Sequence, residues 1–127
     1  MRDLASREDG TATTEWALLL PVLLLLVMLT VQYGLLFHAG QVADAAADEG
    51  LESAQAERGS AAAGRAAAQR FADGDQVLER PQVTADRGAA AVTVTVTGQV
   101  PSLIPGMDRM AVSRTASGPT EQFRPAP

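Results

Sequence analysis

One carboxylate stands directly before a long stretch of uncharged residues. Glu15 is followed by Trp16–Phe37, in which no side chain is charged and leucine and valine dominate. If this stretch lies in lipid, a carboxylate at its edge is costly unless it is neutralised or paired with a cation. The helix dipole also favours an acid in the first turn, by about 0.3–1 kcal/mol. Two interpretations of Glu15 therefore stay open: a group that pairs with a cation, and an ordinary helix start.

The other reactive residue types do not form a pattern that predicts catalysis. The chain contains no cysteine and one histidine, His38, which rules out a thiolate nucleophile, a disulfide framework and a histidine pair with metal-ligand spacing. His38 follows the uncharged stretch directly, where an amphipathic ring commonly rests at the membrane surface. A site made of carboxylates alone would require the fold to bring a partner to Asp73 or Glu79. We therefore expect no enzyme activity, no metal and no cofactor.

The uncharged stretch is long enough to cross a bilayer. As a helix, Trp16–Phe37 would rise by roughly 33 Å at about 1.5 Å per residue, against a hydrocarbon core of roughly 30 Å. A buried helix of a soluble domain is the competing interpretation, but a chain of 127 residues is too small to cover a helix that is apolar on every side. Pro21 removes the hydrogen bond to the carbonyl of Ala17, so we expect a kink in the span.

The charges that flank the span predict its orientation. Arg2, Arg7 and the α-amine precede it, whereas five acidic residues follow it before the next basic residue, Arg58. The positive-inside tendency places the N-terminus in the cytoplasm and the C-terminal part outside. A net charge of −5, with ten arginines scattered singly, argues against nucleic-acid binding. We therefore expect a single-pass protein of the cell membrane.

The residues beyond the span predict a small α+β head. Ser60 is suited to cap a second helix at Ala61–Ala72. Valine and threonine alternate over residues 92–97, the pattern of a half-buried strand, and weaker strands are expected at residues 76–85 and 110–115. The expected fold class is α+β, with a long N-terminal membrane helix, a second short helix and a small antiparallel sheet of about three strands.

Four segments are expected along the chain. They are a leader at residues 1–10, a long helix at residues 11–57 with its span at about 16–37, an extracytoplasmic head at residues 58–118, and a disordered tail at residues 119–127. Within this order, Ala85–Gly88 is expected to form the turn between the first two strands. Asp73–Gly74–Asp75 lacks the further ligands of an EF-hand calcium loop and predicts a turn that ends a helix.

The long helix carries two different faces beyond the span. One face is acidic (Asp44, Asp48 and Glu52), and the other consists of small residues (Ala43, Ala47, Gly50 and Ala54). The acidic residues lie four apart and predict a solvated face. The small residues form a stripe that would let a neighbouring helix approach closely.

The N-terminal motif resembles a known family. Residues 10–15, which read Gly-Thr-Ala-Thr-Thr-Glu before an apolar helix, resemble the type IV pilin signal, in which a membrane peptidase cuts after the glycine. The closer resemblance is to the TadE-like pseudopilins of tight-adherence (Tad, Flp-type) pilus systems. Their pattern is matched by Glu15–Trp16–Ala17–Leu18, Pro21 and Gln32–Tyr33–Gly34. Asp9 departs from it where such leaders usually carry a basic residue, and Gln32 departs where many relatives carry glutamate.

This resemblance implies a function and a set of partners. A prepilin-type peptidase would cut between Gly10 and Thr11, and Glu15 would act in subunit assembly. The protein would be a minor pilin or pseudopilin of a Tad-type pilus or related secretion assembly, with other pilin subunits and the Tad assembly machinery as partners. Two alternatives stay open: an uncleaved, membrane-anchored extracytoplasmic binding module, and a secreted product of an ordinary signal peptide cut at Ala43–Asp44–Ala45.

Overall fold

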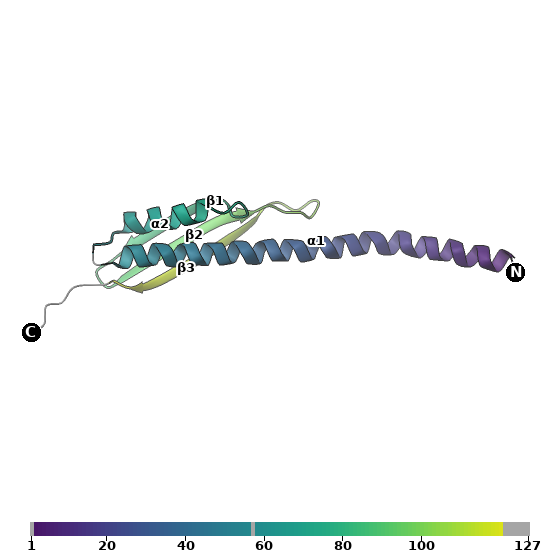
Figure 1. Cartoon of the computed structure of the whole chain (residues 1–127), viewed down its shortest axis with the longest axis horizontal. Helices are drawn as coiled ribbons and strands as arrows, with labels where there is room; N and C mark the ends of the chain where they lie inside the picture. The colour runs from purple at the N-terminus through teal and green to yellow at the C-terminus, as the bar shows by residue number, and fades with distance from the viewer. Residues whose placement is uncertain (1, 57, 121–127) are drawn as a thin grey trace, which may run out of the picture.

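The computed structural model describes residues 2–56 and 58–120, with side chains from residue 12 onward. Its elements are α1 (Arg2–Gln55), α2 (Ala61–Asp73), β1 (Glu79–Arg87), β2 (Ala91–Val100) and β3 (Met110–Pro119). The C-terminal half of α1 lies along a head made of α2 and the three strands, whereas its N-terminal half extends beyond the head (Figure 1). The predicted α+β class, with a long apolar helix, a second short helix and a three-stranded antiparallel sheet, is confirmed.

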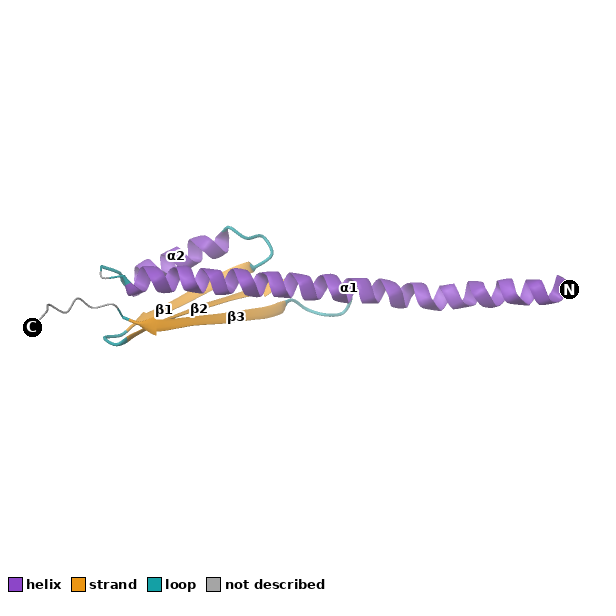
Figure 2. Ribbon diagram, turned by 60° about the horizontal axis from the view of Figure 1, so that its bottom comes forward, coloured by secondary structure: helices purple, strands orange, loops and turns teal. Residues whose placement is uncertain are grey.

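The sheet has the order β1-β2-β3, with both pairs of strands antiparallel. The central strand β2 follows the predicted alternation, because successive side chains of a strand point to opposite faces. Its valines are fully buried at the centre of the core (Val92, Val94, Val96 and Val100). The two helices cover the face that these valines form, and the threonines between them face outward (Figure 2).

The ends of α2 agree closely with the sequence. Ser60 is the N-cap, and its hydroxyl oxygen accepts a hydrogen bond from the backbone N–H of Ala63 at 3.0 Å. The helix ends at Asp73, one residue later than predicted. The backbone N–H of Gly74 then donates to the carbonyl of Phe71 at 3.3 Å, which closes the predicted helix-ending turn.

The first strand begins later than predicted because an aspartate holds the preceding chain in a turn. Asp75 Oδ1 accepts hydrogen bonds from the backbone N–H groups of Val77 at 2.8 Å and Leu78 at 3.1 Å. A side chain that bonds to the backbone two residues ahead competes with strand pairing. The strand expected from Gln76 therefore begins only at Glu79.

The hairpin and the last strand also differ from the prediction. Residues 85–87, expected in a turn, continue β1 and pair with β2. The chain reverses after them, and the backbone N–H of Gly88 donates to the carbonyl of Ala91 at 2.8 Å. Strand β3 extends to Pro119, which was expected to begin a tail, because Ala91 still pairs with it across the sheet. Residues 121–127 of that expected tail lie outside the described residues.

The small-residue stripe of α1 is the seam of the head. All four of its members are buried (Ala43, Ala47, Gly50 and Ala54). A Cβ on Gly50 would lie 2.8 Å from the carbonyl oxygen of Gly64, and a Cβ on Gly64 would lie 2.6 Å from the Cβ of Ala54. The predicted close helix neighbour is therefore α2 of the same chain at this point.

The acidic face of α1 is solvent-exposed, as predicted, at Asp44, Asp48 and Glu52. One of the three also ties the helix to the sheet, because the Arg114 guanidinium of β3 lies 3.5 Å from Asp44. That guanidinium crosses α1 at Gly40, where an added Cβ would lie 2.8 Å from Arg114 Nη2. Gly40 therefore makes room for the arginine that joins β3 to the long helix.

Candidate membrane and assembly site

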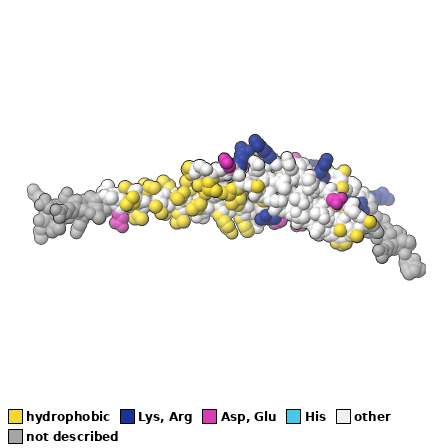
Figure 3. All heavy atoms as spheres, turned by 180° about the vertical axis from the view of Figure 1, so that it is seen from behind, with side chains coloured by type: hydrophobic (Ala, Val, Ile, Leu, Met, Phe, Trp, Pro, Cys, Tyr) yellow, Lys and Arg dark blue, Asp and Glu magenta, His cyan; other side chains and the backbone are white. Residues whose placement is uncertain are grey.

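The N-terminal half of α1 exposes apolar side chains on every side. Trp16, Leu23 and Val31 are 66%, 52% and 46% exposed. Within the described residues, α1 is the one helix long and apolar enough to cross a membrane. Figure 3 shows hydrophobic side chains along this half of the molecule, with arginine side chains gathered over the head. The competing interpretation, a helix buried in a soluble core, does not fit this segment.

Glu15 lies at the N-terminal boundary of this surface. Its side chain is exposed, and it forms no ion pair with residues 12–56 or 58–120. Gly10 and Thr11 lie on the same helix, but their side chains are outside the described set. The structure places these three predicted site residues in sequence along one helix, and no other element among the described residues folds back to meet them. Any partner for the Glu15 carboxylate would come from outside the described chain.

Pro21 lies within the exposed apolar segment, and α1 continues through it. The kink expected there stays a prediction. Beside the proline, a shallow hollow of about 290 Å³ is lined by apolar side chains alone (Trp16, Leu19, Leu20, Val22, Leu23 and Leu26). These residues follow helical spacing, so the hollow runs along one face of α1, where a neighbouring apolar ridge could pack.

Gln32 has a structural role that the sequence analysis did not identify. Its side chain is buried, with 2% exposed. Gln32 Oε1 accepts from the backbone N–H of Leu103 at 2.7 Å, and its Nε2 donates to the carbonyl of Pro101 at 3.2 Å. An amide can do both, whereas an ionised carboxylate can only accept. The residue that departs from the family pattern is thus a clasp between α1 and the loop that joins β2 to β3.

Two signals in the sequence could have indicated this contact. Gln32 is an amide inside an otherwise apolar segment, and buried polar groups are almost always hydrogen-bonded. The segment Pro101–Met107 is uncharged and contains two prolines, which have no backbone N–H to satisfy. Neither signal names its partner, because the two segments lie far apart along the chain.

His38 pairs with an aspartate of the turn that follows α2. Its Nε2 lies 2.9 Å from Asp75 Oδ2. Burial raises the pKa of Asp75, but hydrogen bonds from His38 and from the backbone N–H groups of Leu78 and Val77 outweigh it and lower the pKa below its ordinary 3.8. The pair fastens the turn after α2 to the long helix, directly beyond the apolar segment.

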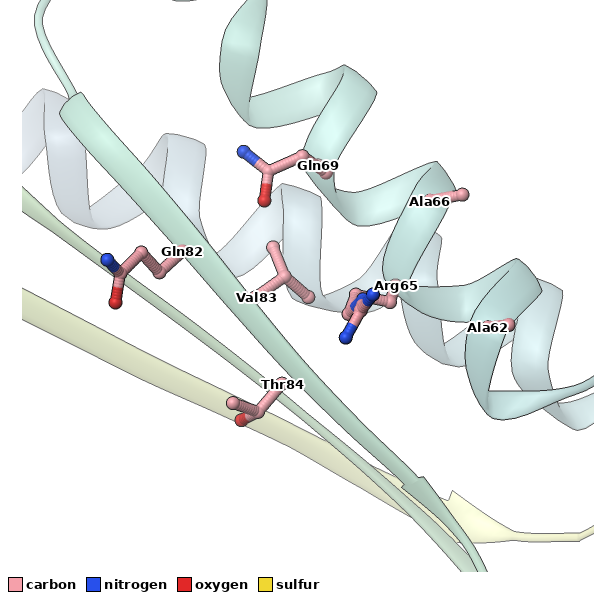
Figure 4. A pocket seen from close by; sticks show the side chains of 7 residues that line it. All are labelled: Ala62, Arg65, Ala66, Gln69, Gln82, Val83 and Thr84. Atoms are coloured by element: carbon pink, nitrogen blue, oxygen red, sulfur yellow. The ribbon is translucent and has the colours of Figure 1, made fainter.

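A groove of about 540 Å³ lies between α2 and β1, and its lining side chains are those labelled in Figure 4 (Ala62, Arg65, Ala66, Gln69, Gln82, Val83 and Thr84). Gln69 bridges its two sides by donating to Asp73 Oδ1 at 3.0 Å and to the carbonyl of Pro81 at 2.9 Å. Arg65 is the one ionisable group in the lining. General acid–base chemistry requires a titratable group of matched pKa, which a guanidinium does not provide.

The carboxylates that could have formed a site of their own are engaged elsewhere. Asp73 accepts from Gln69, and Glu79 Oε2 lies 3.2 Å from the Arg109 guanidinium. Among the described residues no group of three or more histidine, aspartate and glutamate side chains is placed to hold a metal ion.

A long exposed apolar helix with a small α+β head beside its far half fits the class of single-pass membrane proteins. Residues 10–51 match the family model described as TadE-like protein. Over this segment, which includes Glu15, the apolar surface and Gln32, the chain is similar to TadE-like proteins. No curated protein and no solved structure matches the chain.

Proposed function

We propose that the protein is a TadE-like minor pilin or pseudopilin, which packs its membrane helix beside those of other subunits in a Tad-type pilus or related secretion assembly. The observation that carries the proposal is the N-terminal half of α1. Its segment from Trp16 to Val31 is apolar and exposed on every side, directly follows the Glu15 carboxylate and lies within the matched residues 10–51. Such a helix needs lipid or other apolar helices around it, and the hollow beside Pro21 offers a place for a helix.

The mechanism is physical. Cleavage after Gly10 would create an α-amine at Thr11, about 6 Å from Glu15 along the helix axis at about 1.5 Å per residue. A neighbouring subunit's α-amine would neutralise the Glu15 carboxylate. This pairing would also set the register between helices, because a slipped neighbour would leave one charge unpaired near lipid.

The mature N-terminal residue, determined by mass spectrometry, tests this proposal against its alternatives. Thr11 is expected when a prepilin-type peptidase is co-expressed. Gly10→Leu should retain Met1, because a bulky side chain does not fit where the peptidase requires a small one. Gly34→Leu is the matched control, since an added Cβ there meets nothing within 4 Å, and it should be cleaved normally. Wild-type protein that keeps Met1 beside an active peptidase would support the uncleaved binding module instead.

The secreted alternative would begin near Ala46. Cleavage there would remove Ala39 and Ala43, both fully buried in the core of the head. It would also remove the Gln32 clasp and His38, which pairs with Asp75. These contacts favour a mature protein that keeps the whole of α1 beyond the leader.

The proposed orientation, with the N-terminus in the cytoplasm and the head outside, rests on the flanking charges. An alkaline phosphatase reporter fused after Pro127 should be active, because this enzyme folds only outside the cytoplasm. A fluorescent reporter that requires the cytoplasm should be dark at the same position. The opposite pair of results would reverse the placement of the head.

A further inference from the structure

The loop that joins β2 to β3 runs out beyond the sheet toward the N-terminal half of α1 (Figures 1 and 2). It carries no charged side chain from Pro101 to Met107. Two of its large apolar side chains are exposed, Leu103 by 41% and Met107 by 48%. This apolar loop lies beside the long helix at the point where the apolar segment meets the head.

The tip of the loop is a tight turn. The backbone N–H of Met107 donates to the carbonyl of Ile104 at 3.2 Å. Gly106, at φ +83°, has the positive φ that the third position of a type II turn requires, and Pro105 occupies the position before it, where proline is favoured. The turn is therefore a defined structure that presents its apolar side chains.

The backbone donors around Leu103 are also paired. The N–H of Leu103 donates to Gln32 Oε1 at 2.7 Å, and the N–H of Ile104 donates to Ser102 Oγ at 3.2 Å. Pro101 has no N–H, and its carbonyl accepts from the Gln32 amide. Non-helical backbone is tolerated at membrane depth only where its polar groups find partners, and the N–H groups of Leu103 and Ile104 and the Pro101 carbonyl have them.

The clasp at Gln32 sets the depth of the loop relative to the span. If the hydrocarbon core begins at Trp16, Gln32 lies roughly 24 Å along the helix at about 1.5 Å per residue, short of the roughly 30 Å thickness of the core. At this level α1 exposes Tyr33 and Phe37, whose stacked rings have centroids 6.4 Å apart. Aromatic side chains gather at the membrane interface, so the same helix marks a bilayer boundary beside the loop.

We infer that the β2–β3 loop is a second membrane contact, which enters the outer part of the bilayer that α1 spans and turns Leu103 and Met107 toward lipid. The apolar surface of the loop continues that of α1. The charges begin directly after Met107, with Asp108 and with Arg109, which pairs with Glu79 on the head at 3.2 Å. A single helix can rotate about its own axis, so a contact on one side would fix which face of the head meets the membrane.

This inference rests on the membrane span of the proposed function but not on cleavage or on subunit partners. Fluorescence of single labels on the full chain in proteoliposomes of phosphatidylethanolamine and phosphatidylglycerol tests it. The chain has no cysteine, so Met107→Cys carries one environment-sensitive probe. Its emission should be blue-shifted and quenched by lipids that carry a shallow doxyl group. Leu23→Cys is the reference inside the span, and Thr93→Cys, exposed on the head, should stay unquenched.

The outcomes separate the inference from the span. A Met107 label that emits as in water and escapes quenching, while the Leu23 label is quenched, would overturn the loop contact alone. Escape of both labels would overturn the span and the inference with it. If the Met107 label is not quenched by lipid and the loop instead cross-links to a second copy of the chain, the loop belongs to a subunit interface, which would also overturn the inference. If Met107→Cys does not fold, Leu103→Cys reports on the same surface.

Discussion

The backbone N–H of Leu103 donates to the side-chain Oε1 of Gln32 at 2.7 Å. This bond joins a loop late in the chain to the C-terminal part of the apolar segment. The other end of the same amide donates to the Pro101 carbonyl, so one buried side chain satisfies two backbone groups. The position of the head along α1 depends on this clasp, together with the buried seam at Gly50 and Gly64.

Gln32→Leu should weaken the attachment of the loop. The substitution leaves the Leu103 N–H and the Pro101 carbonyl without their partner, at a cost of about 1–3 kcal/mol. Hydrogen exchange of the Leu103 amide in detergent micelles should accelerate accordingly. Gln41→Leu is the matched control, because Gln41 is exposed on the same helix. Equal exchange rates at Leu103 in the two variants would contradict the assigned role of Gln32.

Gly50→Ala should destabilise the head although alanine favours helix formation. A Cβ at Gly50 would lie 2.8 Å from both the Gly64 carbonyl oxygen and the Ala68 Cβ, and overpacking of this kind costs about 1–3 kcal/mol. Gly34→Ala is the control, since its Cβ meets nothing within 4 Å, and the roughly 1 kcal/mol gain in helix propensity should remain. The midpoint of thermal unfolding, followed by circular dichroism, should fall in Gly50→Ala but not in Gly34→Ala.

The pair of His38 and Asp75 predicts a loss of stability in acid. The pKa of Asp75 is lowered from 3.8 in the folded protein, so its carboxylate contributes stability above that value. The contribution is lost as the pH falls through the lowered folded pKa. The difference in melting midpoint between the wild type and Asp75→Asn should therefore shrink as the pH falls from about 6 to about 2. A difference that does not change with pH would contradict this linkage, and Asp73→Asn, at an exposed carboxylate, serves as the control.

Glu15→Gln should weaken assembly without affecting the head. The Glu15 carboxylate is exposed at the start of the apolar surface, and the proposed partner is another subunit's α-amine. The variant should insert and accumulate normally but recover fewer partner pilins on co-purification. Glu15→Asp, whose side chain is one methylene shorter, should recover an amount of partner pilins between those of the wild type and Glu15→Gln. Assembly that survives in Glu15→Gln would return this residue to a helix start, where the dipole accounts for only about 0.3–1 kcal/mol.

The local patterns of the sequence determined the elements. The uncharged segment Trp16–Phe37 predicted an apolar helix, because its length and composition do not depend on the rest of the fold. Alternating valine and threonine predicted the central strand, since the period of two reports directly on which face is buried. Ser60 predicted the start of α2 because an N-cap bonds within its own turn.

The tertiary structure decided what each face meets. The small-residue stripe predicted a close helix neighbour, but only the fold shows α2 of the same chain at Gly50. The late start of β1 follows from Asp75, whose backbone bonds compete with pairing, and the length of β3 follows from the partner strand. The sequence marked Gln32 only as a departure from a family pattern. Its partner Leu103 is 71 residues away, and no local periodicity encodes a contact that forms only when the chain folds back on itself.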